Sequence, residues 1–295
     1  MFDQLFSRRG ISLERLKTLC EIAAAEGIAK AAGRDQSRQS QYSRQLKDLE
    51  THFGTALFNR QTKTLTEAGS RVLEACKPFL TSLEKLSADF SAANQTVSIG
   101  AGQAALDWVL FPRFAALSTA FPRIVWSIRD FNSKDIATRL LDYSLDFGIL
   151  RKEACQNKDM LECRELGVMK FALFVPSALR HGTTIPVAAM ASSEQFTPAF
   201  AKIAEKFTPP LVVKLRCQSF PAIKTIVRTG QCAGMLPLLA ADGFAKPEFE
   251  IVKTPEFSTL ARNYVLAANR KNVSMRDLDK VHNKLAEVCR MQFQD

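Results

Sequence analysis

Apolar residues recur every three or four positions near the start of the chain, in short segments separated by glycine. A first helix is expected from Leu13 to Ala23, ended by Gly27, and a second, shorter helix from Ile28 to Arg34. A third helix is expected from about Arg38 to Phe53, with Ser37 as its N-cap. Its apolar positions form one stripe, which consists of Tyr42, Leu46, Leu49 and Phe53. Two short helices, of which the second leaves a polar face uncovered, predict a helix-turn-helix.

The polar face of the third helix is rich in glutamine and arginine and has no acidic residue before Asp48. It consists of Arg38, Gln39, Gln41, Arg44, Gln45 and Lys47. A charged helix face is usually only solvated, but arginine and glutamine pair bidentately with guanine and adenine, which favours DNA binding. The predicted base-reading residues are Arg38, Gln39, Ser40, Ser43 and Arg44. The other predicted DNA contacts are Lys30, Lys47, Arg60 and Lys63, the last three at phosphates.

A small wing and a long helix are expected next. Leu57–Arg60 and Thr64–Thr66 flank a polar turn and predict a two-stranded wing, and Thr66 is placed to cap a helix from Glu67 to Ala93. Apolar residues in this helix are spaced alternately four and three apart, a heptad pattern that predicts pairing with a second helix. The predicted dimerisation residues are Val72, Phe79, Leu83, Leu86 and Phe90, with Cys76 in the same seam. Pro78 should bend the helix.

After Thr96 the period changes, and short apolar strands alternate with helices. The expected strands are Val97–Ile99, Ile124–Ile128, Phe147–Leu150, Phe171–Val175, Leu211–Leu215 and Ala233–Leu236. The expected helices pass through Trp108 to Leu117, Asp135 to Tyr143 and Met275 to Phe293. This alternation predicts parallel α/β sheets in two lobes.

Ligands of such sheets bind at the carboxyl ends of the strands, where the N-termini of the following helices would suit a carboxylate. The candidate ligand-binding residues are Gly102, Gln103, Asn132, Ser133, Arg151, Gln218, Ser219 and Phe220. Ordinary helix caps and core packing are the alternative interpretation for each of them.

The length of 295 residues suggests two or three domains, and the net charge of +10 favours a polyanionic partner. Residues 1–66, called the head below, carry 11 Lys or Arg against 7 Asp or Glu, so part of the positive excess lies in this segment. The chain shows neither a signal-peptide pattern nor an apolar run of about 18 residues, so no membrane partner is expected.

The seven cysteines are scattered, without zinc-site spacing, and are expected to be free buried thiols in a reducing compartment. None of His52, His181 and His282 lies near a serine or cysteine in a nucleophile motif. Gly100-Ala101-Gly102 lacks the rest of a dinucleotide fingerprint. We therefore expect no enzyme, no metal and no cofactor.

The head resembles that of LysR-type transcriptional regulators at nearly every framework position. The matching segments are Ile28-Ala29-Lys30-Ala31-Ala32, Ser43-Arg44-Gln45-Leu46, Leu57-Phe58-Asn59-Arg60 and Leu65-Thr66-Glu67-Ala68-Gly69. Later segments resemble the same family in the same order, namely Leu110-Phe111-Pro112-Arg113-Phe114, Leu145-Asp146-Phe147-Gly148-Ile149 and the run from Gly230 to Pro237.

This resemblance implies an α/β fold with an α-rich, winged helix-turn-helix at the N-terminus and an effector domain of two Rossmann-like lobes, similar to type II periplasmic binding proteins. The implied boundaries are 1–66 for the head, 67–94 for the linker helix and 95–295 for the effector domain, with lobe I at 95–165 plus 269–295 and lobe II at 166–268. It also implies a homodimer or homotetramer, a small-molecule effector between the lobes, a double-stranded DNA operator, RNA polymerase as a further partner, and a cytoplasmic, nucleoid-associated location.

The chain departs from the family in the turn before the third helix. Asp35 and Ser37 stand where the family usually has apolar residues, and Arg38 and Ser40 where it usually has Ser and Pro. The operator sequence therefore cannot be transferred from relatives. Thiol-based redox sensing is the alternative function, since one branch of the family uses two cysteines in the effector domain and this chain has Cys155 and Cys163 eight residues apart.

Overall fold

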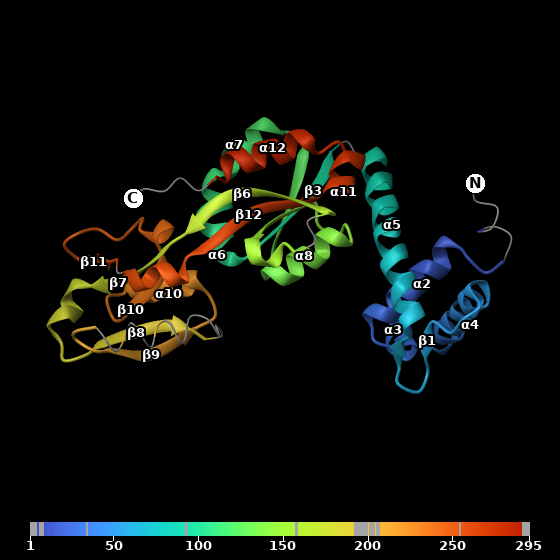
Figure 1. Ribbon diagram of the computed structural model, residues 1–295, viewed down its shortest axis with the longest axis horizontal. Coiled ribbons are helices and arrows are strands. Elements are labelled where there is room, and N and C mark those ends of the chain that lie inside the picture. The colour runs from blue at the N-terminus through green and yellow to red at the C-terminus, as the bar shows by residue number, and fades with distance from the viewer. Residues whose placement is uncertain are drawn as a thin grey trace. The chain divides into compact units, whose positions relative to one another are not determined.

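The computed structural model describes residues 5, 9–33, 35–91, 94–156, 159–191, 200, 204, 207–253 and 255–290. They divide into two compact units, 1–93 with 142–144, and 94–141 with 145–295. The first unit holds a helical head and a long helix, and the second is an α/β structure (Figure 1). Two predicted helix ends, at Arg34 and at Phe293, lie outside the described residues.

The head is built from short helices around one apolar core. They are α2 (Leu13–Ala24), α3 (Ile28–Ala32) and α4 (Gln36–Phe53). Gly27 and Gly33 flank α3 with positive φ values of 139° and 66°, which few other residues adopt. The N-cap of α4 is Asp35, whose carboxylate accepts hydrogen bonds from the backbone N–H groups of Ser37 and Arg38. The expectation of Ser37 as the N-cap was therefore wrong, because Asp35 satisfies the first N–H groups two residues earlier.

The predicted wing is confirmed. Its strands are β1 (Phe58–Asn59) and β2 (Thr64–Leu65), which pair antiparallel. Thr66 caps α5 (Glu67–Ser91) by accepting a hydrogen bond from the Gly69 N–H, and the helix continues through Pro78. A Cβ atom at Gly69 would lie 1.9 Å from the Leu57 carbonyl oxygen, so glycine allows α5 to pack closely under the wing.

The described part of the second unit contains two five-stranded sheets, one in each lobe (Figure 1). The lobe I sheet has the order β4-β3-β5-β12-β6. Its strands are β3 (Gln95–Ala101), β4 (Ile124–Asp130), β5 (Phe147–Arg151), β6 (Leu161–Met169) and β12 (Arg262–Asn269). Strands β3, β4 and β5 are parallel. The helices that follow β3 and β4, α6 (Gln103–Ala105) and α8 (Ser133–Leu141), therefore begin at the same sheet edge.

The lobe II sheet has the order β11-β7-β10-β8-β9, and α10 (Phe220–Arg228) covers it. Its strands are β7 (Phe171–Pro176), β8 (Ile185–Met190), β9 (Leu211–Cys217), β10 (Ala233–Pro237) and β11 (Phe249–Val252). The sequence analysis did not predict β8. Pro186 within it argues against a strand in the middle of a sheet, yet it pairs with Val212 of β9 between two neighbouring strands.

One lobe boundary and one helix differ from the sequence-based prediction. Residues 262–268, assigned to lobe II from the sequence, lie in the lobe I sheet as part of β12. The helix expected from Trp108 to Leu117 is a π-helical turn, Leu106–Leu110, then a 3-10 turn, Phe111–Arg113, and then α7 (Phe114–Ala120). Pro112 cannot donate a helical hydrogen bond, which explains the change in winding.

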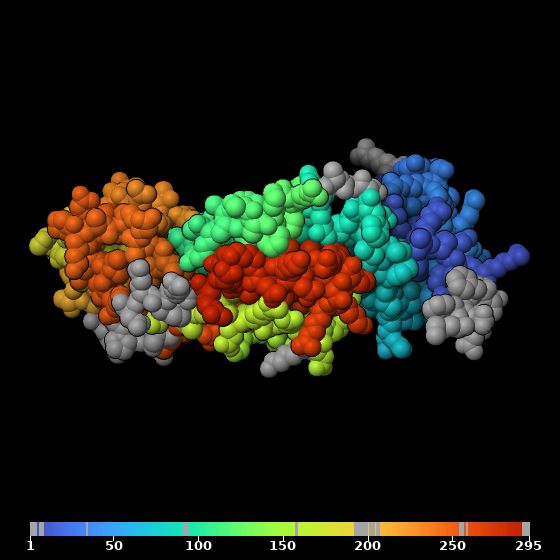
Figure 2. All heavy atoms as spheres, turned by 90° about the horizontal axis from the view of Figure 1, so that it is seen from above, coloured from blue at the N-terminus to red at the C-terminus, as the bar shows by residue number. Residues whose placement is uncertain are grey.

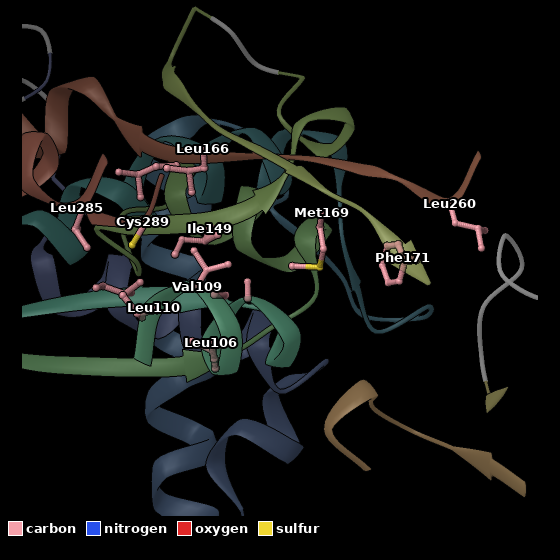
Figure 3. Packing of buried hydrophobic residues seen from close by; sticks show 14 of the residues in the cluster. Leu106, Val109, Leu110, Ile149, Leu166, Met169, Phe171, Leu260, Leu285 and Cys289 are labelled. Carbon is pink, nitrogen blue, oxygen red and sulfur yellow. The ribbon is translucent and has the colours of Figure 1, made fainter. Parts of the chain in front are cut away.

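The C-terminal helix expected from Met275 onward is instead two helices, α11 (Arg270–Met275) and α12 (Asp279–Val288). Between them Asp277 has a φ of 52°, in the left-handed region, and this ends the helical path. α12 lies beside α7 on the surface of lobe I (Figure 2). Beneath them, Val109, Ile149 and Leu285 belong to the large apolar core that extends into lobe II (Figure 3).

A buried ion pair joins three distant parts of lobe I. Arg276 donates from Nη1 to Asp146 Oδ1 at 2.7 Å, and both side chains are almost fully buried. Asn272 donates to the same oxygen at 2.8 Å, and the Ser98 hydroxyl donates to Oδ2 at 2.7 Å. Arg276 also donates to the Thr96 carbonyl, so the network holds β3, β5 and α11 together.

Candidate nucleic-acid interface and ligand site

The packing of α4 decides which of its side chains face outward. Tyr42, Leu46 and Leu49 are buried in the head core against Leu19 and Ile22 of α2. The apolar stripe predicted from the sequence is therefore the inner face of α4, except for Phe53, which is 37% exposed. Most residues of the opposite face are exposed.

Most predicted DNA contacts are exposed on the head. The exposed residues are Lys30, Arg38, Gln39, Ser40, Arg44, Lys47, Arg60 and Lys63, while Ser43 is half-buried. Gln41 and Gln45 differ from the expectation, because Glu14 of α2 accepts hydrogen bonds from both amides and Thr18 donates to Gln45. The polar face available to DNA is therefore narrower than the sequence pattern predicts.

Polar contacts fix α4 on α2 at both ends of this face. The Tyr42 hydroxyl donates to Glu21, and Arg38 donates to the same hydroxyl. Arg15 forms an ion pair with Asp48 at 2.8 Å. Since Asp48 is the acidic residue that closes the polar face, its pairing with Arg15 reduces the repulsion it would exert on a phosphate.

The wing turn carries its two basic residues outward. Asn59 accepts hydrogen bonds from the N–H groups of Gln61 and Thr62, and Lys63 has a φ of 57°. Arg60 and Lys63 are both exposed in the turn that joins the two short strands. Basic side chains on such a ribbon are suited to phosphate contacts.

The long helix α5 exposes large apolar side chains. Phe79, Leu83 and Phe90 are 49%, 37% and 86% exposed, and their spacing places them on one side of the helix. Leu86 of the predicted seam is half-buried. Val72 packs against the head core, and Cys76 is buried in it. The exposed part of the seam therefore starts at Phe79. The heptad pattern alone could not show that the first part of the seam packs in the head core while the later part is exposed.

The lobe I candidates for ligand binding meet at one sheet edge. The Ser133 hydroxyl accepts a hydrogen bond from the Arg151 N–H at 3.1 Å, which ties the start of α8 to the end of β5. Gly102 lies beside Phe131, and a Cβ atom there would approach only the Phe131 carbonyl oxygen, at 3.7 Å. Accepting from Arg151 leaves the hydroxyl hydrogen of Ser133 as a donor for a ligand.

Two other lobe I candidates have local partners. Asn132 accepts from the Asp135 N–H at 2.9 Å and donates to its carboxylate, so it caps α8. Gln103 donates to Asp107 at 3.1 Å. These contacts match the plain interpretation of helix capping, and neither side chain is committed to a ligand by its surroundings.

The sequence analysis missed two residues at this edge. Tyr264 lies opposite Arg151 across the pair of strands β5 and β12, and Arg262 is two positions away on the same strand. Burial raises the pKa of the Tyr264 phenol, while burial and the charge of Arg151 lower the pKa of Arg262. Arg262 adds a second positive charge near Arg151, and Glu153 offsets part of it. The sequence of β12 showed no strand pattern that would have aligned these residues beforehand.

The lobe II candidates lie at the carboxyl end of β9. Ser219 is the N-cap of α10 and accepts from the Ala222 N–H at 3.3 Å, and Gln218 is exposed. Phe220 packs 5.4 Å from Phe171 between ring centroids. It also lines a small, mostly apolar hollow of about 40 Å³, whose other described lining residues are Ala188, Ala189, Met190, Phe200, Val213, Arg216, Ile223 and Met235. Among these described residues Arg216 is the charged one.

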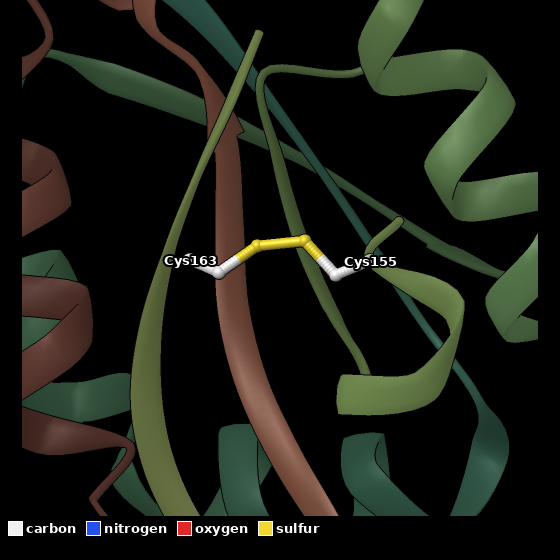
Figure 4. Close-up of a disulfide and its surroundings, with 2 residues drawn as sticks. All are labelled: Cys155 and Cys163. Atoms are coloured by element: carbon white, nitrogen blue, oxygen red, sulfur yellow. A yellow bond between two sulfur atoms is a disulfide. The ribbon is translucent and has the colours of Figure 1, made fainter. Parts of the chain in front are cut away.

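Cysteine pairing differs from the expectation of free thiols. Cys155, which follows β5, and Cys163 of β6 form a disulfide in the structure (Figure 4). The free thiols are those of Cys20, Cys76, Cys217, Cys232 and Cys289.

The described residues contain no cluster of His, Cys, Asp and Glu that could hold a metal ion. In the same residues no helix combines the length and the apolar character needed to cross a membrane.

Comparison with known families matches both units. Residues 13–70 match the bacterial regulatory helix-turn-helix protein model of the lysR family, and residues 91–290 match the LysR substrate binding domain. A curated relative, the HTH-type transcriptional regulator CysL of Bacillus subtilis, is 26% identical over 153 residues, which cover 50% of this chain and 51% of the relative. The chain spans about half the length of the curated relatives it matches.

Solved structures share the fold over nearly the whole chain. Full-length CbnR in complex with its target DNA has a TM-score of 0.55 at 16% identity, covering 94% of this chain and 100% of that one. The regulator LysG of Corynebacterium glutamicum with bound effector Arg has a TM-score of 0.61 at 18% identity, covering 94% and 99%. At this identity the likeness establishes a common architecture of winged head, long helix and two-lobed α/β domain.

Proposed function

Because this chain belongs to the LysR family of bacterial helix-turn-helix regulators, we propose that it binds a specific duplex DNA sequence and regulates transcription under the control of a small molecule. The observation that carries the proposal is the outer face of α4. Its inner stripe is buried, and Asp48, the acidic residue that closes the polar face, is paired with Arg15, so an exposed surface with Arg38, Gln39, Arg44 and Lys47 remains for a DNA groove.

A selection experiment tests this function. The full chain is incubated with a library of random duplexes, and bound DNA is sequenced over successive rounds. We expect one enriched sequence, bound 10³-fold or more tightly than random DNA, on the order of the ratio that specific DNA-binding proteins reach. A matched protein with Arg44→Glu and Lys47→Glu should enrich nothing. Equal affinity of the parent for all sequences contradicts the proposal.

We propose a small anionic molecule with an apolar body as the effector. The cationic edge formed by Arg151 and Arg262 and the hydroxyls of Ser133 and Ser219 are suited to an anion, and the hollow beside Phe220 is suited to the apolar part. Such a molecule controls the protein only if it binds one arrangement of the lobes better than another.

We propose that the chain assembles into a homodimer or homotetramer through the apolar side of α5, and that RNA polymerase is a further partner at the promoter. We propose neither a catalytic activity nor a resident cofactor.

Thiol-based redox sensing is the second candidate function, and the observation that favours it is the Cys155–Cys163 disulfide. Titration of thiols with and without peroxide tests it. Two additional titratable thiols in the reduced protein, with altered DNA binding, would support redox sensing over effector control.

A further inference from the structure

A second pair of cysteines lies inside the head, away from the surfaces described above. The sulfur atoms of Cys20 on α2 and Cys76 on α5 are 3.9 Å apart, although 56 positions separate them in the sequence. Cys76 is buried in the head core, and Cys20 packs against that core with part of its surface exposed. The packing of α2 on α5 thus holds one accessible and one enclosed thiol in contact.

We propose that Cys20 and Cys76 are an oxidisable dithiol, which a hydroperoxide converts into a disulfide that joins α2 to α5. In the first step the Cys20 sulfur bonds to a peroxide oxygen, the O–O bond breaks, and the thiol proton leaves with the departing oxygen as water or an alcohol. Cys76 then attacks the Cys20 sulfur, the S–S bond forms and the S–O bond breaks, and water carries away the Cys76 proton. The two thiols together lose two electrons, which the hydroperoxide gains.

The two thiols differ in the way such a reaction requires. The hydrogen bond with Cys76 is the main cause that lowers the pKa of the Cys20 thiol, and the charge of Lys77 lowers it further. The same contact and burial raise the pKa of Cys76. Since the thiolate is the nucleophile, the more exposed Cys20 is the group that reacts with peroxide, and Cys76 is the group that resolves the product.

Formation of the bond would move the helices that carry the DNA-binding surface. A disulfide has an S–S distance of about 2.05 Å, so the sulfurs must approach by roughly 2 Å. Thr18 and Glu21, which neighbour Cys20 on α2, hold Gln45 and Tyr42 of α4. Displacing this part of α2 therefore displaces α4. This step rests on the proposed function: if α4 binds DNA, we infer that oxidation weakens DNA binding.

The test uses the full chain with Cys155→Ser and Cys163→Ser, which removes the disulfide pair of the second unit. The protein is treated with hydrogen peroxide, digested without reductant and mapped by mass spectrometry. We expect a peptide that links Cys20 to Cys76, a DNA affinity reduced about 5- to 150-fold, the range of ordinary coupling between sites, and recovery of both with dithiothreitol. In the same background Cys20→Ser and Cys76→Ala should keep their affinity after peroxide.

Absence of the linked peptide from the folded, oxidised protein overturns the proposal, and so does a linked peptide with unchanged affinity. Oxidation of Cys20 to the sulfinic acid without linkage also overturns it. The peptide map needs no variant at either position, so misfolding of Cys76→Ala does not affect it. If the reduced protein binds no DNA sequence, the proposed function fails, while the map still shows whether the dithiol reacts as stated.

Discussion

Arg38 donates hydrogen bonds from both Nε and Nη2 to the hydroxyl of Tyr42, at 2.9 and 2.7 Å, one turn further along the same helix. The hydroxyl donates in turn to Glu21. A bidentate contact with guanine uses two guanidinium nitrogens. Because a guanidinium has five N–H donors, Arg38 can read a base either with its Nη1 edge, while it keeps Tyr42, or by exchanging Tyr42 for the base, and replacing each residue tests its role.

Replacing Arg38 by Ala should lower affinity for the selected DNA sequence by about 1–3 kcal/mol, with little effect on random DNA, because a base contact is lost. Tyr42→Phe is the matched variant, since it keeps the buried ring and removes the competing acceptor. Its affinity for the selected sequence should be unchanged or higher. If both variants lose affinity and stability together, Arg38 braces the head instead of reading DNA.

Replacing Lys63 by Ala should weaken binding to all sequences alike. The wing turn holds Lys63 in the open, where it can neutralise a phosphate and release a counterion. The plot of log affinity against log salt should become shallower by about one unit. Lys280→Ala, an equal loss of charge on α12, is the control and should leave the slope unaltered. A loss confined to the selected sequence would place Lys63 at a base instead.

Replacing Leu83 by Asp should convert the proposed dimer into monomers. Leu83 is exposed on the apolar side of α5, and a carboxylate there would be buried without a partner in a helix pair. Ala88→Asp adds the same charge on the other side of the helix and should leave the assembly intact. Sedimentation gives the mass, and circular dichroism shows whether the fold is retained. An unchanged dimer in Leu83→Asp means that the contact lies elsewhere.

The double replacement of Ser133 and Ser219 by Leu should abolish the response to effector while DNA binding persists. The Ser133 hydroxyl ties α8 to β5 and the Ser219 hydroxyl caps α10, so the double Ala variant is the control that loses the same hydrogen bonds without adding bulk. It should bind effector more weakly but still respond. The probe is the small carboxylate that most raises the melting temperature of the parent in a panel. A normal response from the Leu variant would locate the ligand site elsewhere.

His282 should make the second unit less stable in mild acid. Burial, aided by the charge of Arg164, lowers the pKa of His282 to about 4 from 6.5. Between these values the unfolded chain binds a proton and the folded chain does not, so stability is complete above about pH 6.5 and falls as the pH decreases toward 4. From pH 7 to pH 5 this costs about 2 kcal/mol.

The check compares urea unfolding of the parent with that of His282→Gln, which does not titrate. The parent should lose about 2 kcal/mol more than the variant between pH 7 and pH 5. Equal losses in the two proteins would mean that His282 is solvated or already protonated in the folded state. Other groups that titrate in this range affect both proteins and cancel in the difference.

Periodicity predicted the elements whose burial follows one stripe. The inner face of α4, the wing and the parallel strands β3, β4 and β5 were all foreseen from spacing, because each buries residues that are regular in sequence. Strands β6 and β12 were not foreseen. They are antiparallel to each other, and β12 also pairs with β5, whose residues lie more than a hundred positions earlier in the chain. Pattern reading within a short window has no access to such pairing.

Site residues were harder to foresee where side chains choose between partners. Gln45 was expected on the DNA face but turns to Thr18 and Glu14. The seam residue Cys76 turns to Cys20 across the head. The position of a residue in a helix shows on which side of the helix its side chain lies. The neighbouring helix decides which partner the side chain contacts. Arg262 and Tyr264 were missed for another reason, because the sequence of β12 showed no strand pattern that would have placed them beside Arg151.

The Asp146–Arg276 pair has a consequence for how the chain is made. Asp146 is buried, and its cationic partner follows 130 residues later. On the ribosome, β3 and β5 are synthesised long before Arg276, and closing lobe I around Asp146 at that stage would enclose an uncompensated charge, which is costly. The head can fold early, as N-terminal units generally do. Lobe I must wait in an open state, and nascent chains stalled before Arg276 should be the ones that chaperones and proteases recognise.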